Sequence, residues 1–111
     1  MTKVVFNNAY GGFTLSNEAC DRLVELGYDG LKLNPNYDAE ENAFYDYKYF
    51  NDHLIPRHHP LLVKVVEELA EKASGPHSKL EIKEVNGPYR IVEYDGWETV
   101  ETPETIDWIF P

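Results

Sequence analysis

The most constraining feature of this sequence is an amphipathic segment from Pro60 to Ala73. Apolar residues recur in it every three or four positions, and Lys and Glu occupy the positions between them. Proline suits the first turn of a helix because its missing N–H would be unpaired there, and Ser74-Gly75-Pro76 ends the pattern. The spacing therefore predicts a helix over 60–73 with one buried face: Leu62, Val65, Val66, Leu69 and Ala73.

A second, shorter helix is predicted near the N-terminus. Ala19, Leu23 and Leu26 share one helical face. Thr14 or Ser16 offers a side-chain oxygen that can cap the first turn, and Gly27 suits the end of the helix.

The other apolar residues follow strand patterns. Strands are predicted over 3–7, at Leu31 to Leu33, and over 43–50, where aromatic residues alternate. Residues 80–83 and 89–94 alternate in the same way, and Asp95-Gly96 is a strong signal for a two-residue hairpin leading into 97–101. We therefore expect a three-stranded antiparallel meander at the C-terminus.

Together these elements predict an α+β fold. Two helices pack on a small, mainly antiparallel sheet that ends in the C-terminal β-meander. A chain of 111 residues fits one domain, so we expect a single α+β domain over residues 1–111.

The bulk composition predicts a cytoplasmic protein. No apolar run reaches the length of a membrane span, and the first residues lack the apolar stretch of a secretory signal. The chain has one cysteine, Cys20, which fits a reducing compartment. We expect no association with a membrane.

The charge favours a basic protein partner over nucleic acid. The formal net charge is −10, from 20 acidic and 10 basic side chains, whereas binding to a phosphate backbone depends on Lys and Arg. Clustered acids attract basic surfaces. Residues 91–111 contain no Lys or Arg. The acids in that segment are Glu93, Asp95, Glu98, Glu101, Glu104 and Asp107.

Motifs for catalysis or for a cofactor are absent from the sequence. The histidines have no HxxxH spacing, no CxxC is present, and adjacent His58 and His59 point apart in an extended chain. No GxSxG occurs, and Cys20 falls on the apolar face of a predicted helix, where a thiol is usually inert. We predict no catalytic residue, no metal site and no cofactor, and an enzymatic role is the less favoured interpretation.

Two features allow a functional and a structural interpretation. Tyr10-Gly11-Gly12 precedes a helix, where free amides can hold an anion, but paired glycines also let backbones pack closely. Arg57 is the only arginine between Arg22 and Arg90. Its planar fork suits bidentate pairing with a carboxylate, either as a clamp between the 55–59 loop and the sheet or as a ligand anchor.

Aromatic residues predict an interaction surface. Tyr45, Tyr47 and Tyr49 lie on one face of the alternating segment, and Trp97 and Trp108 stand among the C-terminal acids. Tyrosine and tryptophan provide rigid contact area in interfaces. The same pattern also describes a sheet face that packs on the core.

Several short segments stand in a fixed order: KVVFN and YGGF at 3–13, PRHHPLLV and VEEL at 56–69, and KASG, LEI and IVEYDGWE at 72–98. In this order they resemble a widespread family of small phage and bacterial proteins, over more than half of the chain. Residues 28–54 have no counterpart, and Ala70 stands where the family usually has glycine. The resemblance implies a phage or prophage origin and a compact α+β fold, and it implies no reaction.

The sequence leaves two classes of function open. The first is a small acidic accessory protein that binds, and inhibits, a host defence or nucleic-acid-binding protein through its acidic and aromatic surface. The second is a small-ligand-binding protein or enzyme with a pocket near the glycine loop. A homodimer is compatible with both. The residues expected to line the pocket are Tyr10, Gly11, Gly12, Arg57, His59, Tyr94 and Trp97.

Overall fold

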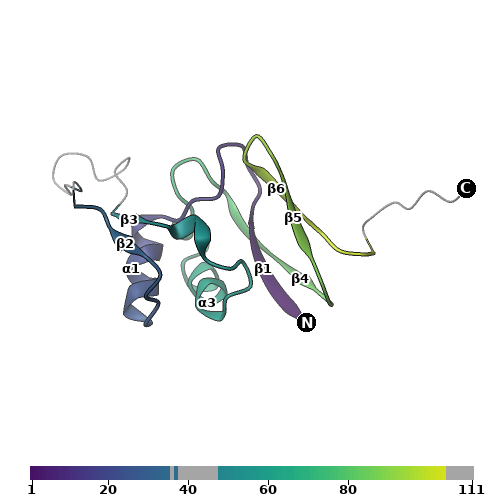
Figure 1. Ribbon diagram of the computed structural model, residues 1–111, viewed down its shortest axis with the longest axis horizontal. Coiled ribbons are helices and arrows are strands. Elements are labelled where there is room, and N and C mark those ends of the chain that lie inside the picture. Colours follow the sequence, from purple (N-terminus) through teal and green to yellow (C-terminus); the bar gives the residue numbers. More distant parts are fainter. Residues whose placement is uncertain (36, 38–47, 105–111) are drawn as a thin grey trace, which may run out of the picture.

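The computed structural model describes residues 1–35, 37 and 48–104, and it confirms an α+β fold (Figure 1). The helical elements are α1 (Asn17–Glu25), η1 (Asp52–Leu54), α3 (Pro60–Leu69) and η2 (Ala70–Ala73). The strands are β1 (Thr2–Asn7), β2 (Lys32–Leu33), β3 (Tyr49–Phe50), β4 (Leu80–Val85), β5 (Arg90–Tyr94) and β6 (Trp97–Glu101).

Local capping explains where the helices begin and end. Ser16 caps α1, because its hydroxyl accepts a hydrogen bond from the amide of Ala19 at 3.1 Å. Helix α3 starts at Pro60, as predicted. Its last predicted turn instead forms the 3-10 segment η2, because Ala70 adopts a positive φ of 52° that interrupts the α-helix.

The strands form antiparallel pairs whose partners are β1 with β4, β2 with β3, and β5 with β6. The predicted β5–β6 hairpin is confirmed: Asp95 and Gly96 have positive φ values of 50° and 86°, the signature of a tight type I′ turn. The expected three-stranded meander is wrong in one pairing, since β4 pairs with β1 and not with β5 within the described residues.

Strand β1 explains this difference, because Val4 and Val5, which point to its opposite faces, are both fully buried. Val5 packs in the core that α1 and α3 cover, whereas Val4 packs with Val85 and Val100 in a second, smaller core. A strand buried on both sides lies between two layers. Strand β4 therefore joins β1, and the β5–β6 hairpin closes the opposite face as a separate layer.

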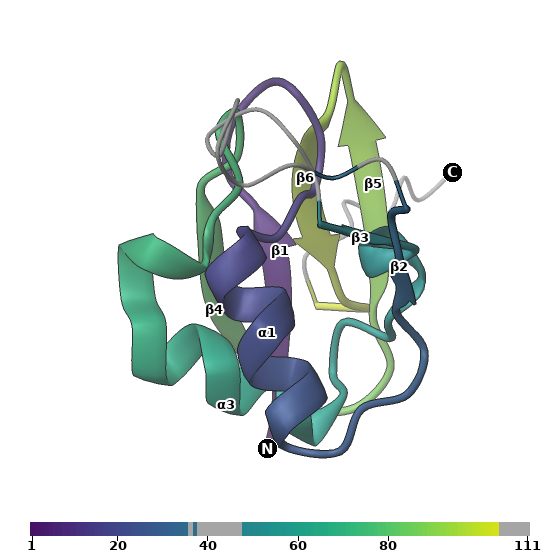
Figure 2. The same ribbon diagram turned by 90° about the vertical axis from the view of Figure 1, so that its left-hand side faces the viewer.

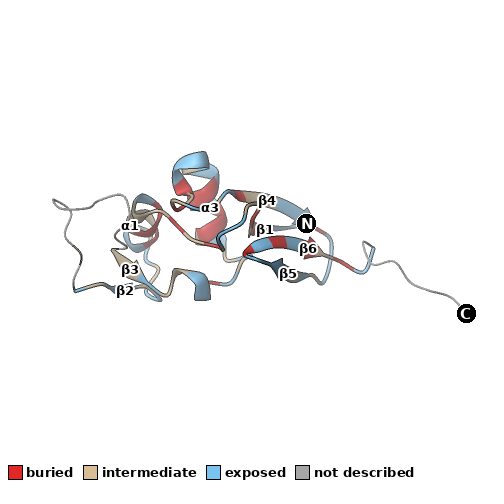
Figure 3. Cartoon of the chain, turned by 90° about the horizontal axis from the view of Figure 1, so that it is seen from above, coloured by how far each residue is buried: buried red, intermediate tan, exposed pale blue. Residues whose placement is uncertain are grey.

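The layers are visible in Figures 1 and 2, where the helices lie on one side of β1–β4 and the hairpin lies on the other. Figure 3 shows that α3 and β6 carry buried residues, whereas β5 is largely exposed. The fold thus carries the β5–β6 hairpin on the outside of a unit in which the helices pack on the β1–β4 pair (Figure 1).

Packing in the main core predicts that truncating a buried side chain lowers the stability of the protein. Leu62 on α3 is fully buried, so Leu62→Ala leaves a cavity and should lower the free energy of unfolding by about 2–5 kcal/mol. Urea denaturation followed by circular dichroism measures this change. Leu54 is exposed, and Leu54→Ala is the matched control with an expected change below about 0.5 kcal/mol. Equal losses in the two variants would contradict this assignment of the core.

Candidate functional site

A buried ion pair joins the loop before α3 to the outer hairpin. The guanidinium Nη1 and Nη2 of Arg57 donate to Oε1 and Oε2 of Glu98 at 2.5 and 2.9 Å. The two side chains are only 16% and 7% exposed. The guanidinium also lies over the ring of Phe13, 3.6 Å from its centroid, a favourable cation–π position. Of the two interpretations of Arg57, the structure shows the clamp.

Asn7, at the end of β1, extends this connection. Its backbone N–H donates to Glu98 Oε1 at 2.9 Å, and its side-chain Nδ2 donates to the carbonyl of Gly96 at 2.8 Å. Its Oδ1 accepts from the amide of Lys79 at 2.9 Å. Asn7 is fully buried, and a buried polar group needs such partners. One residue thus holds β1, β4 and the hairpin turn together.

Sequence reasoning missed Asn7 as a residue of this site. The available signal was the polar pair Asn7-Asn8 that directly follows the apolar run Val4-Val5-Phe6. A polar amide in that place is typical of a strand end whose side chain satisfies neighbouring backbone groups.

The glycine loop packs against the hairpin turn. Gly11 and Gly12 have φ values of 110° and 93°, and the amide of Gly11 donates to the carbonyl of Asp95 at 3.3 Å. A Cβ atom added at Gly96 would lie 2.2 Å from the backbone nitrogen of Gly12. The glycines therefore permit the close backbone approach that was the structural interpretation of this loop.

Of the residues predicted to line a pocket, Tyr10, Gly11, Gly12, Tyr94 and Trp97 are brought together by close packing, and Arg57 pairs with the neighbouring Glu98. The ring of His59 instead packs against Tyr28. His59 caps α3, with Nδ1 accepting from the amide of Leu61 at 3.1 Å. The cavities among the described residues include one of about 640 Å³ between α3 and β4, lined in part by Val66 and Leu80, and one of about 370 Å³ beside Tyr49. Another, of about 200 Å³, is lined in part by Tyr89 and Arg90.

The C-terminal acids do not form one continuous surface. Glu98 was predicted to face a partner, but it is buried and neutralised by Arg57, because β6 turns this side chain toward β1. Glu101 lies 3.3 Å from Arg90. Glu93, Asp95 and Glu104 remain exposed. A hydrogen bond from Thr102 lowers the pKa of the Glu104 carboxyl. Asp107 and Trp108 lie outside the described residues.

The predicted tyrosine surface is visible only at Tyr49, since Tyr45 and Tyr47 lie outside the described residues. The Tyr49 hydroxyl donates to Asp21 Oδ1 at 2.9 Å. Burial, followed by this hydrogen bond, raises the pKa of Tyr49. Tyr49 therefore connects β3 to α1, and its hydroxyl is engaged within the chain.

Exposed apolar side chains gather instead at the tip of the hairpin. Tyr10, Tyr94 and Trp97 are 60%, 73% and 39% exposed. The rings of Tyr10 and Trp97 meet edge to face, with centroids 4.9 Å apart. Val92, also exposed, lies on the same face of the hairpin because it is two residues from Tyr94. We call Tyr10, Val92, Tyr94 and Trp97 the hairpin-tip patch.

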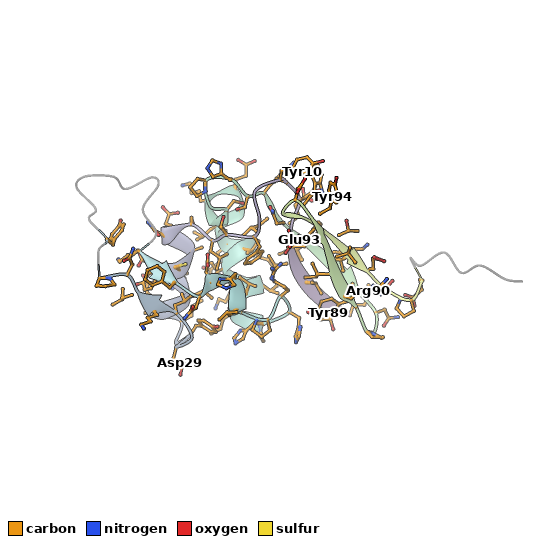
Figure 4. The ribbon with its side chains drawn as sticks, turned by 45° about the horizontal axis from the view of Figure 1, so that its top comes forward. Tyr10, Asp29, Tyr89, Arg90, Glu93 and Tyr94 are labelled. Atoms are coloured by element: carbon orange, nitrogen blue, oxygen red, sulfur yellow. The ribbon has the colours of Figure 1, made fainter. Side chains whose placement is uncertain are left out.

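Carboxylates border this patch. Glu93 and Asp95 are exposed beside Tyr94 in the chain, and Glu93 Oε1 accepts from the amide of Gly96 at 2.9 Å. Figure 4 shows Tyr10, Glu93 and Tyr94 at one end of the hairpin, and Tyr89 and Arg90 at the other. An aromatic cluster with a charged border is the usual composition of a protein interface.

The described residues give little support to a nucleophilic thiol or to a metal site. Cys20 is buried in the main core, and burial raises the pKa of its thiol to about 12, with Asp52 and Asp21 adding to the shift. Within residues 1–35, 37 and 48–104, no three His, Cys, Asp or Glu side chains gather as metal ligands do. His58 Nδ1 instead lies 2.6 Å from the hydroxyl of Tyr89.

Comparisons with family models, curated proteins and solved structures give no match to this chain. The resemblance to the phage and bacterial family therefore stays a prediction. Among the described helices, none combines the length and apolarity required to cross a membrane. The site is accordingly interpreted from its own geometry.

Because the Arg57–Glu98 pair is largely buried, removing one of its charges should destabilise the protein more than removing one charge of an exposed pair. Glu98→Gln leaves the Arg57 charge partly buried without its counter-charge, so the free energy of unfolding should fall by about 2–4 kcal/mol in urea denaturation. The exposed pair between Arg90 and Glu101 provides the control. Glu101→Gln should cost less than about 1 kcal/mol, and similar losses at both sites would show that burial does not govern the Arg57 pair.

The Cys20 thiol predicts slow reaction and a pH-dependent stability. With its pKa raised from 9.0 to about 12, the folded protein should react with a thiol reagent at pH 8 more than about a hundredfold more slowly than the urea-unfolded protein. The raised pKa means that the contribution of Cys20 to stability is complete below pH 9 and declines toward pH 12. Equal rates in both states would contradict the burial of this thiol.

Proposed function

We propose that this protein acts by binding a basic surface on another protein, through the hairpin-tip patch and the carboxylates beside it. The proposal is carried by one observation: Tyr10, Tyr94 and Trp97 are exposed together at one place on the surface. Large aromatic side chains that leave water contribute more to binding than most other residues in an interface.

The chemistry of the patch favours a cationic partner. Lys and Arg side chains bind over the faces of Tyr and Trp rings, and Glu93 and Asp95 add negative charge at the border. The net charge of −10 attracts such a partner over a longer range. A groove that normally holds nucleic acid carries the required Lys and Arg, so a nucleic-acid-binding protein is the partner class that the charge fits best.

The support beneath the patch favours binding by a preformed surface. Gly96 packs against Gly12, and Asn7 donates to the carbonyl of Gly96 at 2.8 Å. The adjoining ion pair between Arg57 and Glu98 anchors β6. Side chains presented on a rigid base lose less conformational entropy when a partner binds.

A small-ligand or enzymatic role at the same place has less support. Arg57, its proposed anchor, makes a bidentate pair with Glu98, and His59 caps α3. A ligand would have to compete with both of these interactions. The surface-binding proposal requires no such rearrangement.

The proposal predicts which side chains control affinity. Basic nucleic-acid-binding proteins are titrated with the full chain, and affinity is measured by isothermal titration calorimetry at two salt concentrations. Tyr94→Ala should weaken binding by about tenfold or more, because it removes an exposed ring from the centre of the patch. Asp95→Asn keeps the positive φ of the turn and should reduce both affinity and its salt dependence.

Matched controls are available at the far end of the molecule. Leu33 on β2 is exposed, and Leu33→Ala tests whether loss of any exposed apolar side chain matters. Asp29 is exposed far from the hairpin (Figure 4), so Asp29→Asn changes the same charge outside the patch. Binding that responds equally to Asp29→Asn and Asp95→Asn would refute a localised site, and a panel without any salt-dependent partner would refute the proposal.

A further inference from the structure

Strand β5 lies at the outside of the hairpin layer. Within the described part of the chain, the only strand paired with β5 is β6. In Figures 2 and 3, β6 lies between β5 and the β1–β4 pair. Four of the five residues of β5 are exposed, whereas Glu98 and Val100 of β6 are buried. One edge of β5 therefore faces solvent.

The geometry of the turn determines which backbone groups lie on this open edge. The type I′ turn at Asp95-Gly96 makes Tyr94 and Trp97 a hydrogen-bonded pair. Because such pairs alternate along an antiparallel ladder, Val92 with Thr99 and Arg90 with Glu101 are also hydrogen-bonded pairs. The N–H and C=O groups of Ile91 and Glu93 consequently point away from β6, toward the open edge.

The side chains along β5 set the pattern that an added strand would meet. Val92 and Tyr94 lie on the outer face, in the hairpin-tip patch, and Glu93 lies on the opposite face at the same edge. A neighbouring strand places its side chains directly opposite those of β5. The complementary strand therefore alternates apolar residues, opposite Val92 and Tyr94, with a Lys or Arg opposite Glu93.

From this arrangement we propose that β5 accepts an extended basic segment of the partner as an additional strand, through the outward N–H and C=O groups of Ile91 and Glu93. This inference rests on the proposed function, because it names how the partner of the hairpin-tip patch is held. Strand addition combines backbone hydrogen bonds, which supply affinity, with side-chain contacts, which supply specificity.

Charge favours a basic segment over a second copy of this chain at the same edge. Two copies would each carry a net charge of −10. A two-fold antiparallel pairing centred on Val92 would also place each Glu93 opposite Ile91 of the other copy, where a carboxylate finds no cation. A Lys or Arg on the added strand removes both penalties.

Amide hydrogen exchange of the full chain, followed by NMR, tests the inference. The probe is a capped peptide of alternating valine and lysine, and the control peptide carries proline in place of alternate valines, which prevents strand pairing. At saturating probe, the amides of Ile91 and Glu93 should exchange about tenfold more slowly or slower still. The amides of Arg90, Val92 and Tyr94 are already paired with β6 and provide the internal reference.

The outcomes separate this inference from the proposed function. If the Tyr94 and Trp97 signals shift while the Ile91 and Glu93 amides keep their exchange rates, the peptide binds through side chains alone, and strand addition is refuted while the surface-binding proposal stands. Slow exchange of both amides without peptide would show an edge that is already paired, which also refutes it. Equal protection by the proline peptide refutes it as well, and no shift anywhere on the hairpin counts against both proposals.

Discussion

The structure depends on one interaction that is almost hidden from solvent, the bidentate pair of Arg57 and Glu98. It joins the loop before α3 to β6 across the end of β1, and Asn7 completes it by donating its backbone N–H to the same carboxylate. A buried charge is costly unless it is paired, so these residues hold one another in place. The hairpin layer is attached to the rest of the fold by this pair, by the small core of Val4, Val85 and Val100, and by the contacts of its turn with Asn7 and the glycine loop.

This attachment determines how the hairpin presents its surface. Because the turn is held from beneath by Asn7 and the glycine loop, the hairpin presents its aromatic side chains on a fixed base. The same register leaves one edge of β5 exposed. In the function proposed above, this anchored hairpin would present the exposed rings and the open edge to the partner.

Much of the local structure was predictable, because it depends on interactions close in the sequence. The periodicity of Leu62, Val65 and Val66 identified α3, and Asp95-Gly96 identified the hairpin. Thr14 and Ser16 were alternative caps for α1, and the structure shows Ser16. The pairing of β4 with β1 was not predictable in this way, since residues 8–79 separate the two strands and alternation alone does not choose a partner. The positive φ of Ala70 also had no signal in the residue itself, because alanine rarely adopts a positive φ.

The candidate site shows the same division. The sequence by itself determined which groups are available to the site: a single arginine between Arg22 and Arg90, paired glycines, a tight turn and an excess of carboxylates. Only the tertiary structure decided which carboxylate Arg57 neutralises and which remain at the surface, because that choice depends on which face of β6 turns toward β1. The number of charges can be read from the sequence, but whether each charge is paired or exposed depends on distances between residues in the folded chain.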